Sequence, residues 1–413
     1  MNTFEITIQR KAGDSWPVIA EQSRPGSYLP VRTEGVLNVD PERLLALLDP
    51  LAYGTHLGQA IFANGVRDAF TRALADSSHD LRVLLFIEAD DLRTLRWERL
   101  CAPLSNNRWS ILARNSQVLF SLYLPSATDS RFPAIGRRDL RALIVAASPA
   151  GLERYGLSHF DVPYAITCAT EALGEIPYDL LASGAGVADH PTLKPVGPAS
   201  LAALAERLTQ EKYTLLHIVG HGSYNKRTGE TSLFLANNQH ELERVTATQL
   251  IEHLGNISNA STLPHFTFLS TCESAASDAE GALGGLGQRL VRELGMPAVI
   301  AMTEKVSVVT ALALTKAFYR QLRQHGEVDR ALVEASATLN GATDVTVPAL
   351  YSRLGGRPLF SDLLTQDRPL TNAEIRYGLE QLNQLLVTRA PVLIAAFETA
   401  AARLRATLTT EAI

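Results

Sequence analysis

The sequence predicts an α/β fold in which a mostly parallel β-sheet is flanked by helices. Short apolar runs alternate with helical patterns over most of the 413 residues. These runs are apolar nearly throughout, which is typical of strands covered on both faces. The stretches between them carry helix start signals. Strands and helices that alternate in this way favour a parallel sheet with right-handed crossovers, and we expect it to hold five or six strands.

The expected elements follow one another along the chain. The predicted strands share a high content of Leu, Ile, Val and Phe, and they cover residues 3–9, 82–87, 140–147, 213–219, 265–269 and 297–302. Residues 60–75 predict an amphipathic helix. Capping boxes at 246–249 and 277–280 predict the starts of two more helices, because hydroxyl and carboxyl or amide side chains can satisfy the first free amides there. Gly295 is expected to end the second of these helices.

The chain divides into an N-terminal part (1–130), a core (131–360) and a helical extension (361–413). Within the core, residues 184–199 are rich in Gly and Pro, which predicts a long surface connection of the kind that borders a cleft. In the extension, a capping box at 371–374 and the interruption at Pro391 predict a helical hairpin. It is either a packing appendix or a docking surface for a sensor or regulator.

Composition excludes several classes of function. The 38 Lys and Arg against 43 Asp and Glu give a net charge of -5, so nucleic acid is not the expected partner. The three cysteines have no CxxC spacing, which argues against disulfides or a zinc site and favours a reducing cytoplasm. The N-terminus does not resemble a signal peptide, and no apolar run approaches the roughly 18 residues of a membrane helix. We expect a cytoplasmic protein that needs no cofactor and binds no metal or membrane.

Two predicted strands carry the candidate chemistry. LLHIVGHGSY (215–224) places His221 at the end of one strand, and FTFLSTCESA (266–275) places Cys272 at the end of another. The crevice beyond the carboxyl ends of parallel strands is where such folds present reacting groups. A thiol needs a base to become a thiolate, which His221 can provide. The amides of Gly222 and Cys272 are candidates to hold the oxyanion. The separation of 51 residues matches the spacing of caspase-type enzymes.

These motifs resemble those of the CHAT-domain peptidases, prokaryotic relatives of caspases and separase. HIVGHG and LSTCESA match the two catalytic motifs, and LRTLRWERL (92–100) is similar to the upstream Trp-Glu motif. Residues 285–306 and 310–322 resemble the helix, strand and helix that close the fold, so the resemblance covers about residues 1–360. It implies a caspase-like sandwich and cysteine endopeptidase activity without a cofactor. It also implies a role in regulated proteolysis in prokaryotic defence, where the substrate is a pore-forming protein or another effector.

The sequence departs from the family pattern around the substrate site. Glu273 follows Cys272 and the caspase signature Gln-Ala-Cys-x-Gly is absent, so caspase specificity for Asp is not implied. Glu273, Asp278 and Glu304 are the acidic candidates for substrate binding, and any of them in the pocket would favour cleavage after Arg or Lys. Asp278 has an alternative role, since a carboxylate stabilises the N-terminus of a helix.

Other features are interpreted as structural. Trp97 and Glu98 are expected to be a buried aromatic and a structural hydrogen bond, and His217 a core histidine. Cys101 has no neighbouring His, and Cys168 lies in a helical pattern where a small apolar residue suffices. The main alternative to an enzyme is a catalytically silent scaffold coupled to a sensor. A serine hydrolase or a P-loop protein would need G-x-S-x-G or Walker motifs, and the chain has neither.

Overall fold

The structure is a computed structural model. It describes residues 1–24, 29–77, 80–104, 108–124, 132, 134–225, 227–257, 263–271, 282–303, 306–339 and 348–361, with a few single positions from 376 to 402. The predicted helical hairpin of 361–413 and the capping boxes at 277–280 and 371–374 lie outside this part. No helix in the described ranges is long and apolar enough to cross a membrane.

The core of the molecule is a parallel sheet in the order β9-β8-β10-β13-β14. Its strands are β8 (Ala142–Ser148), β9 (Tyr178–Gly184), β10 (Leu215–Asn225), β13 (Phe266–Thr271) and β14 (Ala298–Met302). β15 (Pro348–Ser352) adds to β14 in the antiparallel sense. The predicted strands of the core are therefore confirmed, with ends shifted by a few residues.

The sheet is larger than the five or six strands expected from the sequence. The described residues form one sheet of 13 strands, because β7 (Val118–Tyr123) pairs with β15 and brings the N-terminal strands into it. These are β1 (Asn2–Ile8), β2 (Trp16–Ser23), β3 (Val31–Leu37) and β4 (Leu81–Ile87). A hairpin of β11 (Glu230–Ala236) and β12 (Leu242–Thr246) extends the other edge, and β5 (Cys101–Pro103) with β6 (Trp109–Ile111) forms a separate ribbon.

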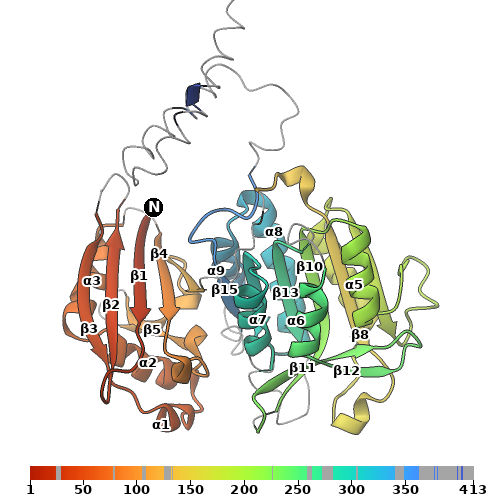
Figure 1. Ribbon diagram of the computed structural model, residues 1–413, viewed down its shortest axis with the longest axis horizontal. Helices are drawn as coiled ribbons and strands as arrows, with labels where there is room; N and C mark the ends of the chain where they lie inside the picture. The colour runs from red at the N-terminus through yellow and green to blue at the C-terminus, as the bar shows by residue number, and fades with distance from the viewer. Residues whose placement is uncertain are drawn as a thin grey trace, which may run out of the picture.

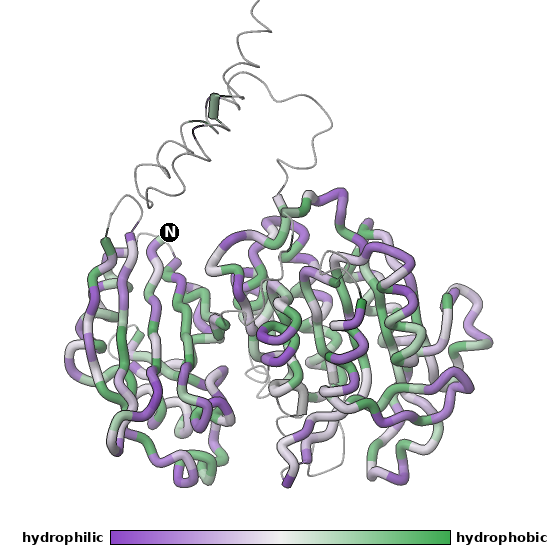
Figure 2. The backbone as a smooth tube through the Cα atoms, viewed as in Figure 1, coloured by the Kyte–Doolittle hydropathy of each residue, from purple (hydrophilic) through white to green (hydrophobic). Residues whose placement is uncertain are grey.

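Helices cover both faces of the core sheet (Figure 1). One face carries α5 (Leu201–Gln210), α6 (Ala247–Gly255) and α7 (Ala282–Glu293), and the other carries α4 (Val162–Leu173), α8 (Val308–His325) and α9 (Val328–Thr338). Alternate residues of each strand join opposite apolar clusters, as in Leu143 against Ile144. Figure 2 shows the resulting hydrophobic stretches along the central strands. The fold is the caspase-like sandwich that the sequence predicts.

The helices of the N-terminal part differ from the single helix predicted over residues 60–75. Instead of one helix over 60–75, α2 (Pro50–Ile61) ends and α3 (Asn64–Ala75) begins after a break. Asn64 has a φ of 47°, in the left-handed region that a helix interior does not use. α1 (Pro41–Leu45) precedes them.

The capping box of Thr246 and Gln249 forms at the start of α6 as predicted, and Gly295 follows α7 with a φ of 72°.

Candidate active site

His221 lies where β10 changes partners. Residues up to Gly220 pair with β13, and from His221 onward β10 pairs with β11, with His221 opposite Phe234. β8 ends at Ser148, and β11 occupies the edge of β10 beyond it. The prediction that His221 lies at the end of its strand was therefore wrong. The parallel ladder does end there, while the strand continues to Asn225.

The imidazole of His221 is buried, with 1% of the residue exposed. Burial lowers its pKa to about 4, the backbone of Ser158 raises the pKa, and the charge of His159 lowers it. Among the described residues, neither ring nitrogen has a hydrogen-bond partner of normal geometry. The ring is therefore neutral near pH 7, so one of its nitrogens can accept a proton.

The segment after β8 encloses this imidazole. The Phe160 ring meets the His221 ring edge to face, with centroids 5.6 Å apart. The Phe160 amide donates to Ser148 Oγ at 3.3 Å, and the same oxygen lies 3.2 Å from His159 Nδ1. His159 Nε2 lies 2.7 Å from Glu153 Oε1. Sequence reasoning missed these residues, because their contact depends on how the segment folds back over the sheet.

The other predicted site residues divide into two groups. Gly222 is described and lies opposite Leu233 in the β10–β11 ladder. The predicted nucleophile and acidic residues lie outside the described residues: Cys272, Glu273, Asp278 and Glu304. Thr271 is the last described residue before the predicted nucleophile, and it pairs with Gly220. The ladder thus brings the residues that immediately precede His221 and Cys272 in the sequence onto adjacent strands.

The Trp-Glu motif is structural, as predicted. Trp97, in η2 (Trp97–Arg99), is 1% exposed, and its Nε1 donates to the carbonyl of Leu92 at 2.7 Å. Thr303 Oγ1 donates to Glu98 Oε1 at 2.8 Å, and both residues are buried. Because Thr303 directly follows β14, this bond ties the N-terminal part to the edge of the sheet where His221 lies.

The remaining histidine and cysteine candidates are accounted for. His217 is buried against Phe268 and Tyr319, whose hydroxyl lies 3.2 Å from Nδ1, so it is a core histidine as predicted. Burial raises the pKa of Cys101 to about 11, which keeps it a thiol. Cys168 is half-buried on α4. Within the described ranges, no group of three His, Cys, Asp or Glu side chains is arranged to hold a metal ion.

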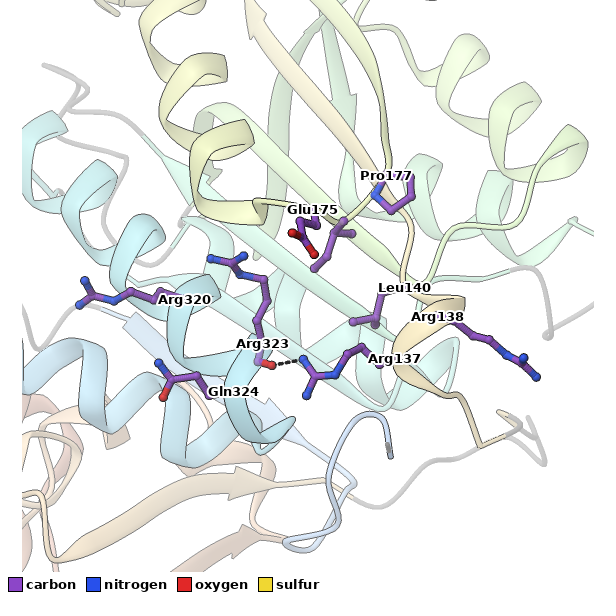
Figure 3. Close-up of a pocket in the computed structure, with 9 residues that line it drawn as sticks. Arg137, Arg138, Leu140, Glu175, Pro177, Arg320, Arg323 and Gln324 are labelled. Atoms are coloured by element: carbon purple, nitrogen blue, oxygen red, sulfur yellow. Dashed lines mark hydrogen bonds between the residues drawn. The ribbon is translucent and has the colours of Figure 1, made fainter. Parts of the chain in front are cut away.

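A cavity of about 590 Å³ lies at the opposite edge of the sheet (Figure 3). It is lined by residues that precede β8 and β9 and by the end of α8, including Arg137, Arg138 and Arg323. Arg137 donates to the backbone carbonyl of Arg323 and lies over the Phe360 ring, 4.9 Å from its centroid. Arg138 and Arg320 extend away on opposite sides. These contacts stabilise the end of α8, and the cavity is remote from His221.

Comparison with known families identifies the class. The CHAT domain model matches residues 51–376, so the chain belongs to the CHAT family, which is related to caspase-like proteases. A comparison with curated proteins finds no match. Among solved structures, a mutant of the PilB minor pilin from Streptococcus sanguinis is 11% identical, with 83% of this chain and 80% of that chain covered. The TM-score between the two structures is 0.25.

Proposed function

We propose that the protein is a cysteine endopeptidase in which Cys272 is the nucleophile and His221 the general base and acid. The observation that supports this most strongly is the pairing of Gly220 with Thr271. Residues that follow a parallel pair on adjacent strands start about 5 Å apart, which suits a nucleophile and its base. The neutral, buried imidazole of His221 fits the same role.

The proposed reaction follows from these groups. His221 takes the thiol proton, and the sulfur of Cys272 bonds to the carbonyl carbon of the substrate, which forms an oxyanion held by amide hydrogens such as those of Gly222 and Cys272. The carbon–nitrogen bond then breaks, and the imidazolium gives its proton to the leaving amine. A water molecule, deprotonated by His221, attacks the thioester carbon and releases the acid and the thiol. The reaction needs no cofactor.

The proposal also covers the pathway in which the peptidase acts and the peptide bonds that it cleaves. Membership of the CHAT family supports a role in regulated proteolysis in a prokaryotic defence or cell-death pathway, with a pore-forming or other effector protein as substrate. Glu273, Asp278 and Glu304 remain the proposed acidic residues at the substrate site, which favours cleavage after Arg or Lys. The extension of 361–413 is the proposed contact for a sensor or regulator. Efficient cleavage after Leu or Asp, with none after Arg or Lys, would contradict the proposed specificity for basic residues.

The decisive experiment compares cysteine variants of the full chain on a peptide library made from a digested proteome, with mass spectrometry of new N-termini. Cys272→Ala and His221→Gln should each reduce cleavage by about a thousandfold or more, because each removes a reacting group. Cys168→Ala is the matched control and should cleave like the wild type. Iodoacetamide should alkylate Cys272 faster than Cys168 at neutral pH, and His221→Gln should abolish that difference.

The alternative function is a catalytically silent scaffold coupled to a sensor. It predicts that Cys272→Ala processes substrates and affects cells as the wild type does. It also predicts that Cys272 and Cys168 react with iodoacetamide at similar rates. Either pair of results separates the scaffold from the enzyme.

A further inference from the structure

A cavity of about 680 Å³ lies at the carboxyl ends of β8 and β9, and β8 is the neighbour of β10, the strand that carries His221. Its walls include Ser148 and Ser183 at the strand ends, the segment that follows β9, and His240 in the turn between β11 and β12. The β11–β12 hairpin reaches this end of β8, since Glu241 forms a bridge with Ala150 (Figure 1). The cavity walls also include residues of the Gly- and Pro-rich segment 184–199, which the sequence predicts to border a cleft.

Two serine–histidine pairs form the polar part of this cavity. Ser148 Oγ bonds His159, whose Nε2 is occupied by Glu153. Ser183 Oγ lies 2.9 Å from His240 Nδ1 and accepts the Ala199 amide at 3.0 Å. When the Ser183 hydroxyl donates to Nδ1, the ring proton of a neutral His240 is on Nε2, and in a protonated ring Nε2 is likewise a donor. Among the described residues, Nε2 of His240 has no hydrogen-bond partner.

The turn backbone at His240 suits a residue without a β-carbon. His240 has a φ of 62°, a left-handed conformation that Gly or Asn adopts at lower cost. Apart from the two imidazoles, the lining residues carry no charged side chain. His240 is exposed, so its Nε2 can meet a bound ligand, and a carboxylate makes the strongest hydrogen bond to such a donor. A lysine or arginine side chain of the substrate could form no ion pair here, because the lining contains no Asp or Glu.

The order of the strands relates the cavity to the proposed cleavage site. Cys272 follows β13, His221 is on β10, and β8 and β9 come next on the far side. Since the imidazole must protonate the leaving amine, the leaving segment lies on the His221 side of the sulfur. β8 and β9 are about 5 and 10 Å beyond β10, and an extended peptide advances about 3.3 Å per residue. The second or third residue after the cut reaches the cavity.

We propose that this cavity binds an acidic side chain at the second or third residue of the leaving segment, through Nε2 of His240. The inference rests on the proposed peptidase function and names a substrate class for it. His240 determines specificity here and takes no part in the bond changes. His159, Ser148 and Ser183 hold the walls in place.

The test uses the full chain and the proteome-derived peptide library, with sequencing of the new N-termini. Glu and Asp should be enriched about tenfold over Lys at the second or third residue. His240→Gly suits the positive φ, so it should fold with an unchanged melting temperature and lose the enrichment. His190→Gly is the matched control, because His190 lies in the segment after β9 but is not part of the cavity lining, and it should keep the enrichment.

The outcomes separate the two proposals. If the wild type cleaves and Cys272→Ala does not, while the residues after the cut show no acidic preference, only the subsite is refuted. The same holds if His240→Gly keeps the preference. If the wild type fails to cleave, or Cys272→Ala cleaves equally, both proposals fall. As an independent readout, adding the peptide amide Ser-Ala-Glu-Ala should shift the NMR signals of the His240 ring and leave those of His190 unchanged, and equal shifts at both would refute the subsite.

Discussion

The two buried histidines of β10 should make the protein unusually sensitive to acid. Burial lowers the pKa of His217 from 6.5 to about 3 and that of His221 from 6.5 to about 4. Both folded pKa values lie below the unfolded value, so their contribution to stability is fully present above pH 6.5 and is lost as the pH falls toward the folded values. Between about pH 7.5 and 5, the unfolded chain takes up a proton at each ring and the folded protein does not.

The size of the effect follows from the same shifts. One pKa unit corresponds to about 1.4 kcal/mol, so over this pH range each ring lowers the free energy of unfolding by about 2 kcal/mol. The two together remove about 4 kcal/mol, a large part of the roughly 5–15 kcal/mol that stabilises a typical domain. Urea denaturation at several pH values between these limits measures the loss directly.

A double variant isolates the contribution of His217. His217→Leu with Tyr319→Phe removes both partners of the 3.2 Å hydrogen bond, so neither is left buried and unpaired. Its loss of stability between about pH 7.5 and 5 should be smaller than that of the wild type by about 2 kcal/mol. His56→Gln, at an exposed position of α2, should behave like the wild type. An equal loss in the double variant and the wild type would refute the reasoning.

Two further predictions concern packing and charge, and both are checked by urea denaturation. Gly58→Ala should destabilise the protein by about 3 kcal/mol, because its Cβ would lie 2.1 Å from the backbone oxygen of Cys101. Gly255→Ala, with the nearest atom at 3.6 Å, should be neutral or slightly stabilising, and a similar cost at both sites would contradict the packing argument. Arg82→Leu should cost about 3–5 kcal/mol by leaving Asp329 buried without its ion pair, and adding Asp329→Leu should recover much of that loss.

The core of the fold could be predicted because its strands are apolar on both faces. Residues 82–87, 140–147 and 297–302 correspond closely to β4, β8 and β14. The junction of the N-terminal strands with the core could not be predicted. Within the sheet it is made by two residue pairs between β7 and β15, strands more than two hundred residues apart, and no local pattern records such a pairing.

The site was predictable to a similar extent. His221 stands out in the sequence because it follows an apolar strand and lies between two glycines. The structure places it where the parallel ladder of β10 and β13 ends. Phe160 and Ser148 could not be found in this way. Their contacts with His221 and His159 arise when an irregular segment folds back over the strand ends, and such segments have no periodicity to read.

The residues around His221 and those around the cavity come from partly different elements of the fold. His221 is held by Phe234 on the neighbouring strand and by the Phe160 ring of the segment after β8. The cavity walls come from the segments after β8 and β9 and from the β11–β12 turn. Loops vary at little cost to stability. Changes at His240 can therefore alter which leaving segment is accepted while the imidazole that protonates it stays in place.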